Sequence, residues 1–304
     1  EFGGPEVLEI VELPDPEPGE GEVLVEVARS GMNFADTHQR QNDYLAKAEL
    51  PLTPGGEISG KTADGHVVHP AEALYKKAVL IERSRFRPPT HLNMNMIDCA
   101  RTQFMAEREV PENDVLVVSE MTLHNLMDGG DIDVRDFLHR AEILCALGKN
   151  VMISNLGEYY RLAAYLFRYT QKPMGVVLGV PTLREVFDEK YYTDLPGGIL
   201  ESFGRLFKYD LRLYVGPALG EDRKNLVTVE NFEPPTHLRH LYAYLYSNGF
   251  IKNLRGVNAE LLSIFSHEIL RKIRTGQPEW QECVPPVVAQ MIREKHLFGC
   301  GDQC

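Results

Sequence analysis

Short apolar runs alternate with helix-like segments along most of this chain, from residue 78 onward. The runs lie at residues 78–81, 115–118, 151–153, 175–178 and 211–215. Each is too short for a typical helix and is rich in aliphatic residues, as buried parallel strands are. Parallel strands need a crossover between them, and a helix is the usual one. The pattern therefore predicts an α/β fold in which helices flank a parallel sheet.

Segments with helical spacing fill the intervals and continue to the C-terminus. The expected helices span about 92–107, 134–147, 158–170, 182–192, 198–207, 237–246, 266–274 and 286–295. Asp133 stands where an N-cap would, and Gly148 follows the same helix where positive φ is favoured. Thr182-Leu183-Arg184-Glu185 has the spacing of a capping box. We therefore expect an α/β domain over 63–217 and a helical C-terminal region over 218–304 that packs on it.

The first 62 residues differ from the rest in charge and pattern. They contain thirteen acidic side chains and four basic ones, whereas the whole chain has a net charge of −12. Residues 7–13 and 22–28 alternate apolar and polar side chains, which indicates half-buried strands. Farther on, Asp64-Gly65 favours a tight hairpin turn. The sequence therefore predicts a domain boundary at residue 62, after a β-rich opening segment.

The composition limits the classes of partner. No apolar run approaches the roughly 18 residues of a membrane helix, and the first residues lack the pattern of a signal sequence. A pI near 5.4 argues against binding to a nucleic-acid backbone, which requires concentrated Lys and Arg. Five scattered cysteines fit a reducing compartment better than a disulfide framework. We expect a cytoplasmic protein without membrane or nucleic-acid partners, and its oligomeric state stays open.

Carboxylates end the first two predicted strands. Glu82 follows the first apolar run and Glu120 the second. Ligands of open α/β sheets bind beyond the carboxyl ends of the strands. Two carboxylates there could share a proton or hold a divalent cation; the alternative is a structural role, either solvated or paired with arginine. Both are candidate catalytic residues, and no metal site with a defined set of ligands is predicted.

Further polar residues stand at the same predicted edge of the sheet. Asn155 and Glu158 follow the third strand and are also candidate catalytic residues, although Asn155 could instead cap the next helix. Arg83 and Arg85 are candidate substrate-binding residues because arginine binds carboxylate and phosphate groups. A solvated loop is the alternative for these arginines. Thr182, after the fourth strand, is the last candidate for substrate binding.

Four motifs in residues 1–62 occur in the order found in a known enzyme family. They are Phe2-Gly3-Gly4-Pro5-Glu6-Val7-Leu8, Pro16-Glu17-Pro18-Gly19-Glu20-Gly21-Glu22-Val23-Leu24-Val25, Gly31-Met32-Asn33-Phe34-Ala35-Asp36 and Pro54-Gly55-Gly56-Glu57. This set resembles the N-terminal, GroES-like part of zinc-free quinone oxidoreductases, in the medium-chain dehydrogenase/reductase superfamily. The resemblance implies an NADPH-dependent reductase in which Asn33 and Tyr44 approach the nicotinamide and the substrate.

The sequence departs from this family after residue 62. A complete member would continue into a cofactor domain with a glycine-rich turn between a strand and a helix, where the pyrophosphate binds. No G-x-G-x-x-G motif occurs in the chain. We therefore expect an incomplete GroES-like segment without its cofactor-binding partner surface.

The remainder of the chain, residues 64–299, contains stretches similar to a second family. They lie at 70–77, 160–169, 179–185, 197–207 and 237–242. They resemble the C-terminal half of an uncharacterised bacterial family whose automated labels include nicotinate-nucleotide adenylyltransferase and TonB-dependent receptor. The usual nucleotidyltransferase has a histidine pair near a glycine in its first phosphate loop, and the receptor needs an export signal and many alternating strands. The sequence shows neither, so this resemblance implies a fold and no defined chemistry.

Together these features favour a small-molecule-binding α/β protein with its pocket at the strand ends; whether it is an enzyme stays open. The first alternative is an NADPH-dependent quinone or enone oxidoreductase, with hydride passing to an acceptor held near Asn33 and Tyr44. NADPH is expected as a cofactor only under this alternative. The second alternative is a non-catalytic interaction protein or a chimeric reading frame.

Overall fold

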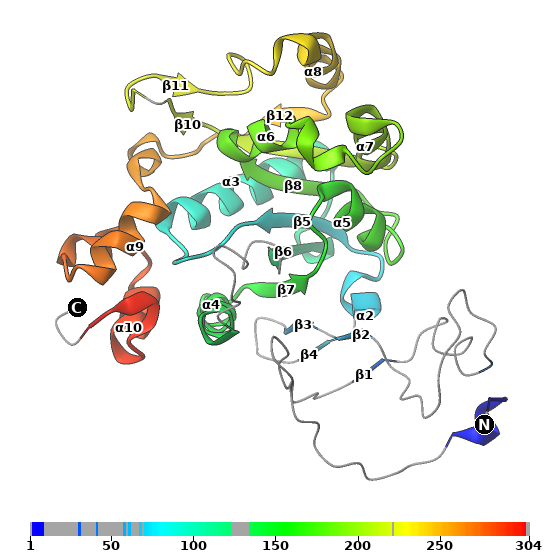
Figure 1. The fold of residues 1–304 in the computed structure, drawn as a ribbon, viewed down its shortest axis with the longest axis horizontal. Coiled ribbons are helices and arrows are strands. Elements are labelled where there is room, and N and C mark those ends of the chain that lie inside the picture. The colour runs from blue at the N-terminus through cyan, green and yellow to red at the C-terminus, as the bar shows by residue number, and fades with distance from the viewer. Residues whose placement is uncertain are drawn as a thin grey trace.

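A parallel sheet covered by helices forms the centre of the molecule (Figure 1). The computed structural model of the chain describes residues 2–8, 30–31, 41, 57–58, 60–61, 67–68, 70–122, 134–220 and 222–301. The predicted α/β class is confirmed. None of the described helices is long and apolar enough to cross a membrane.

Six parallel strands make up most of the sheet. They are β5 (Ala78–Arg83), β6 (Val115–Thr122), β7 (Asn150–Ser154), β8 (Met174–Gly179), β9 (Leu211–Gly216) and β12 (Ile251–Asn253). Across the sheet they follow the order β12-β9-β8-β5-β6-β7. The chain therefore leaves the adjacent strands β5 and β8 in opposite directions, toward β6 and β9. This is the strand order of a doubly wound α/β fold.

The first five of these strands coincide with the predicted apolar runs, but β12 was not predicted. It comes from the C-terminal region that was expected to be helical, and it pairs with β9 through Ile251 and Leu213. A strand of three residues is too short to give a recognisable period in the sequence. The C-terminal region thus contributes to the sheet as well as packing on it.

Two short antiparallel strands extend the opposite edge of the sheet. They are β3 (Gly60–Lys61) and β4 (Val67–Val68), and Lys61 pairs with Val151 of β7. The two strands flank the predicted hairpin turn at Asp64-Gly65, whose residues lie outside the described part of the chain. Another small pair joins β1 (Ser30–Gly31) to β2 (Glu57–Ile58). The sheet therefore includes residues on both sides of the predicted boundary at residue 62.

Helices cover both faces of the sheet, because successive strand residues point to opposite sides. On one face lie α3 (His91–Arg108) and α4 (Val134–Ala146), and on the other lie α5 (Tyr159–Leu166), α6 (Val180–Val186), α7 (Gly198–Leu206) and α8 (Arg239–Ser247). Leu80 of β5 packs with Phe104 of α3, whereas Ile81 belongs to the core on the other face. A Cβ at Gly175 would lie 2.7 Å from Leu80 Cδ1, so a larger residue at this position of β8 would force the buried Leu80 side chain to shift.

The last two helices form a smaller core of their own. α9 (Ser266–Arg274) and α10 (Pro286–Glu294) surround Trp280, which is fully buried. Ile143 of α4 belongs to the same cluster, so this core is continuous with α4, beside which α10 lies in Figure 1. The prediction of helices near the C-terminus is thus confirmed.

Local signals account for several helix ends. Gly148 has φ +70° after α4, as predicted for a residue that follows a helix. The predicted capping box at Thr182 is wrong, because α6 begins at Val180 and has Gly179 as its N-cap without a side-chain hydrogen bond. Pro181 sits in the first turn, where its fixed φ favours the start of a helix. Asp133, the predicted cap of α4, lies outside the described residues.

Candidate functional site

The strand order defines where a ligand site is expected on this fold. Because the chain leaves β5 and β8 in opposite directions, the loops that follow these two strands diverge at the carboxyl edge of the sheet. In open α/β sheets, ligands bind in the crevice at this point. In this chain Glu82 and Arg83 end β5, and Gly179 ends the adjacent strand β8, so these residues mark the expected position.

Glu82 is a buried carboxyl group at the end of β5. Its side chain is on the α3 face and the residue is only 3% exposed. Oε1 accepts a hydrogen bond from Asn93 Nδ2 at 2.8 Å, but Oε2 has no partner among the described residues. Burial raises the pKa of Glu82 to about 7, although the bond from Asn93 acts in the opposite direction. The group can therefore gain or lose a proton near neutral pH.

The first turn of α3 holds Glu82 in place through Asn93. Thr90 caps the helix: its Oγ1 accepts from Asn93 N at 3.3 Å, and Asn93 Oδ1 accepts from Thr90 N at 3.1 Å. The amide group of Asn93 is thus fixed by the cap on one side and bonded to the carboxyl group on the other. Our sequence interpretation missed both residues. The three-residue spacing from Thr90 to Asn93, directly after Pro88-Pro89, could have indicated the cap.

Arg83 and Glu120 form an ion pair on the opposite face of the sheet. Both side chains are buried, and Arg83 Nε lies 2.5 Å from Glu120 Oε2. The second carboxylate oxygen accepts from Arg83 Nη2 at 3.1 Å and from the Ser154 hydroxyl. Arg83 also donates to the carbonyl oxygens of Leu156 and Gly157 at 2.7 and 2.5 Å. The pair therefore fixes the loop between β7 and α5.

The structure does not bring the two predicted carboxylates together. In the register of β5 and β6, Glu82 lies opposite Ser119 and Arg83 lies opposite Glu120. Because neighbouring residues of a strand point to opposite faces, Glu82 and Glu120 are on different sides of the sheet. Glu120 instead neutralises Arg83. Among the described residues there is also no group of three His, Cys, Asp or Glu side chains that could hold a metal ion.

Asn155 and Glu158 lie on the loop that Arg83 fixes. Asn155 is exposed, and it does not cap α5. Glu158 occupies the N-cap position without a capping hydrogen bond and forms an ion pair with Arg161 at 3.1 Å. Both side chains are thus at the carboxyl edge of the sheet, on the α5 side.

The structure describes two of the remaining predicted site residues, Arg85 and Thr182. Arg85 is exposed in the β5–α3 loop, where its carbonyl oxygen accepts from Arg140 Nη1 at 2.9 Å. Thr182 is half-buried in α6, directly after β8. Asn33 and Tyr44 lie outside the described residues.

Comparison with known proteins bears on the N-terminal part of the chain. Residues 19–72 match the family model of the alcohol dehydrogenase GroES-like domain. Quinone oxidoreductase of Lama guanicoe is 46% identical over 63 residues, which are 20% of this chain and 18% of that protein. Human quinone oxidoreductase is 41% identical over 61 residues, with the same two shares. An alcohol dehydrogenase of Schizosaccharomyces pombe is 41% identical over 58 residues, which are 19% of this chain and 17% of that protein.

These matches confirm the resemblance of the first 62 residues to quinone oxidoreductases. The chain, however, spans less than a fifth of the length of these curated relatives. Among solved structures, it is similar to Plasmodium falciparum nicotinic acid mononucleotide adenylyltransferase complexed with APC, with 10% identity and a TM-score of 0.46 over 74% of this chain and 98% of that one. The complex of that enzyme with NaAD gives a TM-score of 0.44 with the same identity and shares.

Proposed function

We propose that the α/β unit binds a small molecule in the crevice between β5 and β8, with Glu82 as the group that contacts it. One observation carries this proposal: a carboxyl oxygen of Glu82 is buried at the carboxyl edge of the sheet without a hydrogen-bond partner among the described residues. Leaving a buried polar atom unpaired costs about 1–3 kcal/mol. A ligand that donates an N–H or O–H group to Oε2 offsets this cost.

The pKa of Glu82 also suits the site to acid–base chemistry. A carboxyl group with a pKa of about 7 exists in both protonation states at neutral pH, which suits general acid–base catalysis. In this proposal Glu82 exchanges a proton with the ligand and Asn93 orients it. Arg85 and Thr182 contribute substrate contacts, and Asn155 and Glu158 border the crevice from the α5 side. Glu120 acts through Arg83 as a positioning residue.

A thermal-shift screen of small polar molecules tests this function. A compound that raises the melting temperature of the wild type should lose most of that effect with Glu82→Ala. The matched control is Glu112→Gln, which changes an exposed carboxylate and should leave the shift intact. Equal shifts in the wild type and Glu82→Ala for every stabilising compound would refute the assignment of Glu82.

A second candidate function is an NADPH-dependent quinone or enone reductase. The match of residues 19–72 to the GroES-like domain favours it. In this reading Asn33 and Tyr44 approach the nicotinamide and the acceptor. The test is a titration of NADPH with the protein in which the fluorescence of NADPH is measured. A saturable change that Asn33→Ala weakens would support the reductase, whereas an unchanged spectrum at millimolar protein would reject it.

A further inference from the structure

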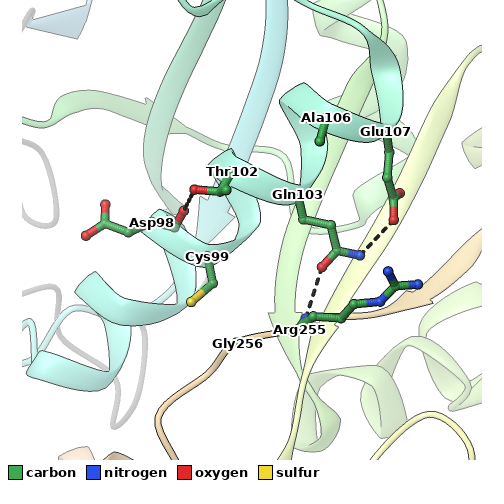
Figure 2. A pocket seen from close by; sticks show the side chains of 8 residues that line it. All are labelled: Asp98, Cys99, Thr102, Gln103, Ala106, Glu107, Arg255 and Gly256. Carbon is green, nitrogen blue, oxygen red and sulfur yellow. Dashed lines mark hydrogen bonds between the residues drawn. The ribbon is translucent and has the colours of Figure 1, made fainter.

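A groove runs along the outer side of α3, separate from the crevice at Glu82. It has a volume of about 510 Å³, within the range of pockets for small ligands. Cys99, Thr102 and Ala106 contribute one wall, and Arg255 and Gly256 contribute the other (Figure 2). The three α3 residues follow a spacing of three and four, so they share one face of the helix.

A glutamine joins the two walls of the groove. Gln103 Nε2 donates to the carbonyl oxygen of Asn253 at 3.1 Å, and Gln103 Oε1 accepts from Arg255 N at 3.0 Å. Figure 2 shows the latter bond crossing from α3 to the segment after β12. Gly256 follows with φ +79°, a conformation that favours glycine. The groove is therefore preformed, because its walls are fixed to each other by hydrogen bonds.

The charged side chains that line the groove differ in whether they have partners of opposite charge. Glu107 accepts from Lys252 Nζ at 2.8 Å, from Gln103 Nε2 at 3.0 Å and from the Tyr214 hydroxyl at 3.3 Å. Burial raises the pKa of Glu107, but the hydrogen bonds from Lys252 and Gln103 outweigh this and lower it. Asp98 also lines the groove and lies 4.0 Å from Lys149 Nζ. By contrast, no carboxylate of the described residues lies within ion-pair distance of the Arg255 guanidinium, which belongs to an exposed residue. This end of the groove thus offers a cation without a partner anion.

We infer that the groove binds a small organic carboxylate with an apolar body. The guanidinium of Arg255 receives the carboxylate, since its planar donors match the two oxygens. The apolar body lies along Cys99, Thr102 and Ala106, whose methyl and sulfur atoms supply nonpolar contact. This site does not depend on Glu82, so the two proposals can fail separately.

Isothermal titration with octanoate tests the inference, with 1-octanol as the uncharged comparison. Octanoate should bind the wild type, and octanol should bind roughly tenfold more weakly or not at all. Arg255→Met should weaken octanoate binding by about the same factor while Arg255→Lys restores part of it. Arg239→Met, on α8, is the matched control and should bind octanoate as the wild type does.

A second variant and a second readout locate the ligand. Ala106 is exposed, so Ala106→Trp fills the groove without entering the core, and it should abolish binding. Bound octanoate should also slow the alkylation of Cys99 by iodoacetamide several-fold, as measured by peptide mass spectrometry. Glu82→Gln should leave both results unchanged. Equal affinity of octanoate for the wild type, Arg255→Met and Ala106→Trp would overturn the inference, and so would a lack of binding to the wild type at millimolar octanoate.

Discussion

Replacing Glu82 by glutamine should make the protein more stable above neutral pH and have a much smaller effect at pH 5. Glu82 is 3% exposed and has a pKa raised from 4.5 to about 7, mainly by burial. The folded protein therefore binds a proton at Glu82 in a pH range where the unfolded chain has lost it. Stability must fall as pH rises from about 4.5 to about 7, and it levels off above that range.

The size of the effect follows from the shift in pKa. Each unit corresponds to 1.36 kcal/mol, so the ionised carboxylate of Glu82 lowers the free energy of unfolding by about 3 kcal/mol at pH 8. Glutamine has nearly the shape of the protonated acid and can still accept the bond from Asn93. Glu82→Gln should thus exceed the free energy of unfolding of the wild type by about 1 kcal/mol at pH 5 and by about 3 kcal/mol at pH 8.

Urea unfolding at pH 5, 6, 7 and 8 measures this difference. The transition can be followed by circular dichroism and by the fluorescence of Trp280, the one tryptophan in the chain. Coincident transitions would justify a two-state analysis. All other titrating groups are shared by the two proteins, so they cancel in the comparison. Glu112→Gln serves as the control at an exposed carboxylate. A difference between Glu82→Gln and the wild type that stays constant from pH 5 to pH 8 would refute the reasoning.

Three further predictions concern stability. Arg83→Met should lower the free energy of unfolding by about 3–5 kcal/mol because Glu120 is left buried without its partner, and the double variant Arg83→Met/Glu120→Gln should recover much of that loss in urea titrations. Gly175→Ala should cost about 1–3 kcal/mol, since the new Cβ would lie 2.7 Å from Leu80 Cδ1; a wild-type melting temperature would contradict the packing described. Thr90→Ala should cost about 1 kcal/mol by removing the cap of α3, whereas Thr90→Ser should preserve stability.

The periodicity of the sequence was sufficient to predict most of the α/β fold. The predicted runs at 78–81 and 211–215 correspond to β5 and β9, because buried parallel strands require continuous apolar residues. β12 could not be predicted in this way. Its three residues gain their structure from pairing with β9, which is a contact between distant segments and leaves no local period. The capping box at Thr182 failed for a different, local reason: Pro181 lies in the first turn of α6, which begins at Val180, before Thr182.

The register between neighbouring strands, which determines which residues of the candidate site share a face of the sheet, could not be predicted from the sequence. That Glu82 and Arg83 point to opposite faces of β5 follows from alternation within one strand. Which of them shares a face with Glu120 depends on the register between β5 and β6, because a shift of one residue would exchange the faces. The observed register places Arg83 opposite Glu120, so that carboxylate is neutralised, whereas Glu82 faces α3 with one oxygen unpaired among the described residues. The same two carboxylates thus differ in chemistry, and for this reason the acid–base role is proposed for Glu82 alone.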